Sequence, residues 1–169
     1  MTETLVQWFV THLGGSAAKE LIVFLISMIP ILELRGGLLA AGPAFLDIPI
    51  LRAVPICIVG NVIPVPFILL LIRWIFKLMK KTKIFRPMVE WLENKAMSKK
   101  DQIETYGFWG LVLFVGIPLP GTGAWTGSLI AALLGMKFKK AFPAVLLGIA
   151  IATVIMSALS YGLLGALFG

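Results

Sequence analysis

Two ionisable residues interrupt an otherwise apolar stretch, at Glu33 and Arg35 within the sequence ELRGG. A charged side chain at the centre of a membrane helix costs about 2.5 to 3.5 kcal/mol on insertion scales, so such residues usually have a function. Desolvation can make a carboxyl group neutral, which would allow Glu33 to carry a proton. An arginine keeps its charge, so the natural role of Arg35 is to hold an anion. The alternative is a structural pair in which the two charges neutralise each other.

A second segment, PLPGTGAWTG at residues 118–127, has no charge but is typical of a broken helix. A helix that restarts near Gly123 would direct unpaired N–H groups and the positive end of its dipole towards the membrane interior, which favours an anion. Thr122 would add a hydroxyl group, and Trp125 could flank a substrate. The segment therefore predicts half of a binding site.

Glycines in membrane helices also have a simpler role, because they permit close helix packing. For Gly127 and Gly135 we favour that role. Asn61 could line a cavity, but a hydrogen bond between helices explains it equally well. The predicted substrate and proton site comprises Glu33, Arg35, Gly36, Asn61, Pro118, Pro120, Gly121, Thr122, Gly123 and Trp125.

The composition places these residues in a membrane protein. The chain is 59% hydrophobic and 14% charged, against about 25% charged residues in soluble domains. Nine of the fifteen basic residues fall between Arg73 and Lys100, which indicates retention on the cytoplasmic side and not a nucleic-acid partner. No metal-ligand cluster, nucleotide loop or catalytic triad is recognisable, so neither an enzyme nor a cofactor or metal is expected.

The breaks in the apolar runs predict an all-α integral membrane fold with a single domain over residues 1–169. Residues 20–46 and 106–136 each consist of two short apolar arms around a Pro/Gly break. An arm of about a dozen residues measures about 18 Å, against about 30 Å of hydrocarbon, so each pair predicts a re-entrant hairpin. The apolar runs at 53–72 and 141–168 predict transmembrane helices. Residues 1–14 predict an interfacial helix, and residues 73–105 an amphipathic cytoplasmic linker.

The two hairpin-and-span segments, 20–72 and 106–168, align at a fixed offset of 88 residues. Identical pairs include Pro30/Pro118, Pro55/Pro143 and Gly60/Gly148. If each half holds one non-crossing hairpin and one span, the second half enters the membrane from the opposite face. The sequence therefore predicts an inverted repeat.

The ELRGG and PLPGTG motifs together resemble the small multidrug export family, which is grouped with the DedA superfamily of membrane proteins. The resemblance runs from about Leu21 to Phe168. It implies two opposed re-entrant hairpins near the membrane midplane and a transporter or lipid-translocase activity, since DedA-type relatives are associated with undecaprenyl phosphate recycling, lipid scrambling and proton-dependent drug resistance. Those relatives typically carry the acidic residue and the arginine in different hairpins, whereas Glu33 and Arg35 share one hairpin here.

Three functions are consistent with these observations. The first is a proton-coupled translocator of a lipid with an anionic head, such as undecaprenyl phosphate or a phospholipid, in which Arg35 and the helix start near Gly123 bind the phosphate and Glu33 couples proton movement. The second is a proton-coupled exporter of lipophilic cations, in which Glu33 exchanges cation for proton and Trp125 stacks on the cation. The third is a structural or assembly protein.

The expected location and partners follow from the same features. We expect an integral protein of the plasma (inner) membrane whose partners are membrane lipids, protons and the substrate. A homodimer is a further expected partner, because two spans leave the hairpin tips poorly shielded from lipid.

Overall fold

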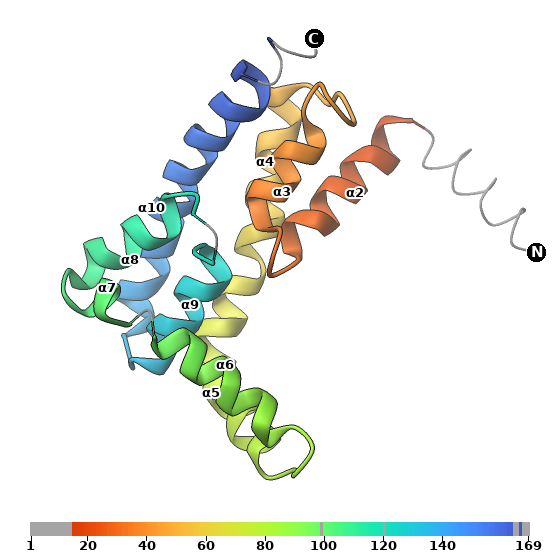
Figure 1. Cartoon of the computed structure of the whole chain (residues 1–169). Helices are drawn as coiled ribbons and strands as arrows, with labels where there is room; N and C mark the ends of the chain where they lie inside the picture. The colour runs from red at the N-terminus through yellow and green to blue at the C-terminus, as the bar shows by residue number, and fades with distance from the viewer. Residues whose placement is uncertain (1–14, 99, 120, 164–165, 167–169) are drawn as a thin grey trace, which may run out of the picture. The chain divides into compact units, whose positions relative to one another are not determined.

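The computed structural model describes residues 15–98, 100–119, 121–163 and 166. Their regular structure is helical, and no strand occurs among them (Figure 1). The all-helical prediction is therefore confirmed for this part of the chain. The interfacial helix predicted at residues 1–14, and Pro120, lie outside the described residues.

The chain divides into two compact units. Unit 1 comprises Met1–Asn61 and Thr153–Gly169, and unit 2 comprises Val62–Ala152. The two ends of the sequence thus contribute to one unit and its middle forms the other.

Unit 1 contains α2 (Ser16–Met28), α3 (Glu33–Ala41), α4 (Ile50–Val62), the end of α10 and the π-helix η1 (Ala158–Leu163). The α2 helix ends because Ile29, directly before Pro30, takes the extended backbone that a following proline favours (ψ 131°). The Ser160 hydroxyl donates to the Leu38 carbonyl (2.8 Å) and the Tyr161 hydroxyl to the Ile48 carbonyl (2.7 Å). These bonds tie the end of the chain to α3 and to the connection that follows it.

Unit 2 contains α5 (Pro64–Lys80), α6 (Arg86–Met97), α7 (Lys100–Glu104), α8 (Gly107–Gly116), α9 (Ala124–Leu133) and the beginning of α10 (Phe138–Ser157). The α8 helix ends as α2 does, with Ile117 extended before Pro118 (ψ 122°). The α9 helix packs against α5, α6 and α8. Gly127 lies at the α8 contact, since a methyl group added there would be 2.6 Å from Val115 Cγ2.

Among the described residues, two helical segments are long and apolar enough to cross a membrane, Ile50–Lys80 and Phe138–Gly162. The predicted span 53–72 lies within the first, and the predicted span 141–168 begins within the second. The first helical segment continues eight residues beyond the uncharged run, because the basic residues that follow Ile72 end the apolar stretch without breaking a helix.

Positive backbone φ angles recur 88 residues apart. Glu33 (φ 51°) corresponds to Gly121 (φ 78°), and Asp47 (φ 50°) corresponds to Gly135 (φ 73°). The packing role predicted for Gly135 is wrong, because no atom lies within 4 Å of the position its side chain would take. The left-handed backbone explains this glycine instead.

Close helix contacts recur at the same spacing. A methyl group added at Gly60 would lie 2.7 Å from the Phe24 carbonyl oxygen and 3.0 Å from Ser27 Cβ. At Gly148 it would lie 2.9 Å from the Val112 carbonyl oxygen and 2.5 Å from Val115 Cβ. The contacted residues are themselves 88 positions apart, so each hairpin meets the helix that follows it in the same way.

Candidate functional site

Glu33 is the first residue of α3 and lies at the break of the first hairpin. Only 4% of it is exposed, and its φ of 51° is in the left-handed region. A residue other than glycine in that region costs about 1 to 3 kcal/mol. The carboxyl group is therefore both buried and held on a strained backbone.

Arg35 follows on α3 and is partly buried. Glu33 lies close enough for its charge to act on the guanidinium group of Arg35. Both residues also take part in further interactions within the protein. The structure thus brings together the two charged residues that the sequence singled out.

Gly36 and Gly37 allow the hairpin to close. A methyl group added at Gly36 would lie 2.7 Å from Leu32 Cβ. At Gly37 it would collide with the Ser27 hydroxyl oxygen and lie 2.9 Å from Cys57 Sγ. Close contact therefore accounts for Gly36 without a substrate.

Asn61 lies at the end of α4, where only 3% of it is exposed and its side-chain oxygen has no hydrogen-bond partner. Figure 1 shows α3 and α4 joined at one end, so that they run in opposite directions. Gly37 of α3 lies next to Cys57 of α4. Glu33 lies one turn before Gly37, and Asn61 lies one turn after Cys57. Because the two helices run in opposite directions, Glu33 and Asn61 lie at a similar level of unit 1. A buried acceptor without a donor thus lies at the level of the hairpin break.

The second hairpin turns through Pro118, Gly121, Thr122 and Gly123. Gly121 and Gly123 have φ angles of 78° and 137°, which favour glycine. The Thr122 hydroxyl lies 2.9 Å from the Ile117 carbonyl oxygen and 2.8 Å from that of Leu119. This hydroxyl is engaged within the turn, which accounts for Thr122 without a ligand.

Trp125 lies in the first turn of α9 and is partly buried. Ala124 and Trp125 both have interaction partners in the protein, so the start of α9 already makes contacts of its own. Ser128, further along α9, is completely buried and its hydroxyl oxygen has no partner. Ser128 was not predicted as a site residue, although a serine in an apolar helix can indicate a hydrogen bond between helices.

An open pocket of about 270 Å³ lies beside this turn in unit 2. Its lining is almost entirely apolar and comprises Tyr106, Gly110, Leu113, Phe114, Ile117, Leu119 and Thr122. Such a lining suits a hydrocarbon or aromatic group better than a phosphate.

The predicted site residues thus form two groups. Glu33, Arg35, Gly36 and Asn61 belong to unit 1, and the residues from Pro118 to Trp125 belong to unit 2. Residues 33–155 match the model of the family described as "Putative small multi-drug export protein". The chain belongs to this family. The match begins at Glu33 and contains both groups.

Membership in the small multi-drug export family confirms the resemblance to that family and indicates a membrane transporter; the family description names export and no enzymatic reaction. No curated protein and no solved structure matches the chain.

Proposed function

We propose that this member of the small multi-drug export family is a proton-coupled exporter of lipophilic cations, in which Glu33 exchanges a proton for the cation. One observation carries the proposal. Glu33 is buried on a left-handed backbone at the position where the other half of the chain has Gly121. Glycine would avoid both the backbone strain and the desolvation of a carboxyl group. A residue with both costs is more easily explained by function than by folding.

The remaining observations support a hydrophobic cargo. The pocket beside the second hairpin turn is lined by Tyr106, Phe114 and aliphatic side chains. Aromatic rings attract organic cations through their π-electrons. The family description also names drug export.

A second candidate function is translocation of a lipid with an anionic head, as the DedA resemblance implies. Arg35 favours it, because this guanidinium is only partly buried and could bind a phosphate. The Thr122 hydroxyl argues against lipid translocation, because it is hydrogen-bonded within its own turn and not directed to a ligand. We therefore place lipid translocation second.

We further propose that the hairpins are re-entrant and that the two halves form an inverted repeat. Helices α3, α8 and α9 have nine or ten residues and α2 has thirteen. None reaches the roughly 20 residues that a crossing needs. The matched φ angles and glycine contacts at a spacing of 88 residues support the repeat. Accessibility labelling should find residues 47–52 and 137–140 on opposite sides of the membrane, and a shared side would exclude the inversion.

Transport in vesicles separates the candidate functions. With purified protein and an imposed proton gradient, Glu33→Gln should abolish movement of a fluorescent lipophilic cation, while Arg35→Ala should reduce it less. Glu20→Gln is a matched control, because Glu20 is a carboxylate of unit 1 whose side chain lies 3.6 Å from Arg52. It should leave transport unchanged.

Other outcomes would replace the proposal. If Arg35→Ala abolishes movement of a labelled phosphate lipid and the cation is not moved, the protein is a lipid translocator. If Glu33→Gln and Arg35→Ala both transport normally but unfold more easily, the two charges form a structural pair.

A further inference from the structure

The end of α5 and α6 form a closed helical hairpin in unit 2, which we call the basic arm (residues 73–97). The Lys80 ammonium group pairs with the Glu93 carboxylate between the two helices. The Arg86 guanidinium donates from Nε to the Lys80 carbonyl oxygen (3.1 Å), next to the turn. These contacts hold the arm in one shape and neutralise one of its acidic residues.

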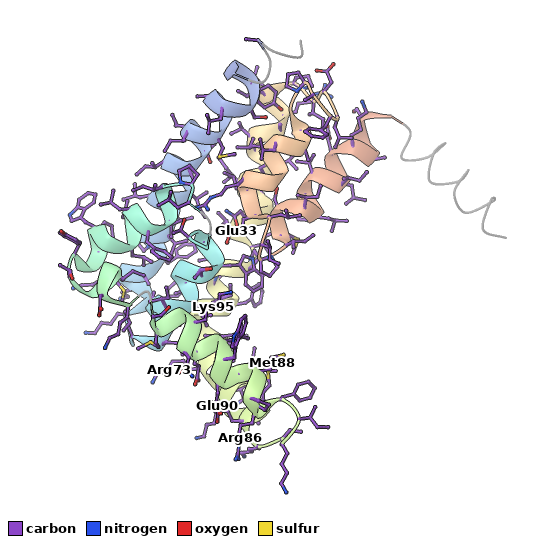
Figure 2. All side chains as sticks on the ribbon, viewed as in Figure 1. Glu33, Arg73, Arg86, Met88, Glu90 and Lys95 are labelled. Carbon is purple, nitrogen blue, oxygen red and sulfur yellow. The ribbon has the colours of Figure 1, made fainter. Side chains whose placement is uncertain are left out.

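The net charge of the protein is concentrated here. Residues 73–100 contain nine lysines and arginines but only two glutamates, whereas the remainder of the chain has six basic and six acidic residues. The whole excess of +7 therefore lies on the arm and the residues directly after it. Figure 2 shows Arg86 and Lys95 at opposite ends of α6, with Glu90 between them. Because α6 has two basic and two acidic residues, the positive charge of the arm lies on the end of α5 and on the turn that follows it.

Large apolar side chains are exposed among these charges. Trp74, Ile84 and Trp91 are 62%, 79% and 58% exposed. The Lys95 ammonium group lies 4.6 Å from the centre of the Trp91 ring. Exposed indole rings beside lysines are typical of the boundary between hydrocarbon and headgroups.

The arm also begins at that boundary. Residues 53–72 form an uncharged run of 20 residues, which matches a hydrocarbon thickness of about 30 Å. Arg73 is the first charged residue after this run, and the arm follows directly. Positive charge, exposed indoles and position together fit a surface of lipid phosphates.

We propose that the basic arm is a docking surface for the anionic phospholipid headgroups of the leaflet in which α5 leaves the hydrocarbon. The lysines and arginines attract the phosphates, while Trp74 and Trp91 lie among the headgroups. Docking of the arm on the membrane surface then depends on the charge of that leaflet, whereas insertion of the protein into the membrane does not. This inference is independent of the proposed transport at Glu33.

The test places a spin label at Ile84→Cys in a Cys57→Ser background, using the full chain in vesicles. In phosphatidylcholine mixed with phosphatidylglycerol, the label should lose accessibility to a water-soluble relaxation agent, compared with phosphatidylcholine alone. The difference should disappear in 1 M salt, where the Debye length falls to about 3 Å. The control is a label at Leu51→Cys. Leu51 is 86% exposed and lies at the opposite end of the same helical segment, so this label should not respond to the charge of the lipid.

Charge variants identify the surface that acts. Lys77→Gln, Lys81→Gln and Lys83→Gln combined should abolish the lipid dependence, whereas Lys77→Arg, Lys81→Arg and Lys83→Arg combined should retain it. Equal accessibility of the Ile84→Cys label in both lipids would overturn the proposal. Protection that depends on protein concentration and not on lipid charge would also overturn it, and would assign the surface to a second copy of the chain.

Discussion

Replacing Glu33 by glycine and by alanine tests the backbone argument directly. Both changes remove the carboxyl group, so the loss of its interaction with Arg35 is common to both and cancels in the comparison. A left-handed φ of 51° costs a residue with a Cβ about 1 to 3 kcal/mol, and the greater freedom of unfolded glycine offsets about 0.5 to 1 kcal/mol of this. Glu33→Gly should therefore be more stable than Glu33→Ala by about 0.5 to 2 kcal/mol.

The assay is equilibrium unfolding of the purified protein in detergent. Ala40 is the matched control, because it lies within α3 and carries an ordinary helical backbone. Ala40→Gly should cost about 0.5 to 1 kcal/mol, which is the opposite preference. Equal stability of the two Glu33 variants, or greater stability of Glu33→Ala, would refute the argument from strain. Cation transport by Glu33→Gly would refute the role of the carboxyl group even if the stability difference were found.

Three further predictions concern packing and the second turn. Gly148→Ala would place a methyl group 2.5 Å from Val115 Cβ and 2.9 Å from the Val112 carbonyl oxygen, so unfolding should show a loss of about 1 to 3 kcal/mol; an unchanged midpoint would contradict the contact. Gly42→Ala would collide with the Ser160 hydroxyl oxygen. The double variant with Ser160→Ala should therefore unfold at a higher denaturant concentration than Gly42→Ala alone. If the two substitutions change the free energy of unfolding additively, the clash is excluded. Thr122→Val should lose about 1 kcal/mol because the hydroxyl closes its turn, whereas Thr122→Ser should keep that stability, and identical values for the two variants would assign the effect to packing.

Several features could be predicted from sequence because local chemistry determines them. Pro30 and Pro118 mark the hairpin breaks, since each proline constrains the residue before it. The long uncharged runs indicate the two membrane helices. The ELRGG and PLPGTG motifs, taken together, were sufficient to identify the family.

Other features depend on contacts that sequence patterns do not report. Glu33 has a left-handed backbone at the turn of the hairpin, and the helical propensity of glutamate gives no sign of it. The Thr122 hydroxyl was predicted to be available to a substrate, but it bonds to carbonyl groups of its own turn. The bond from Ser160 to Leu38 joins residues 122 positions apart, so only the folded chain shows it.

The division into two units has a mechanical consequence. The chain passes between them twice, at Asn61–Val62 and at Ala152–Thr153, and both passages lie inside long apolar helices. Pro64 and Pro66 have no N–H group, so the helical bonds to the carbonyls of Gly60 and Val62 are missing around the first passage. No proline lies within a turn of the second. The helix that carries the first passage should therefore bend more easily at that point than the helix that carries the second.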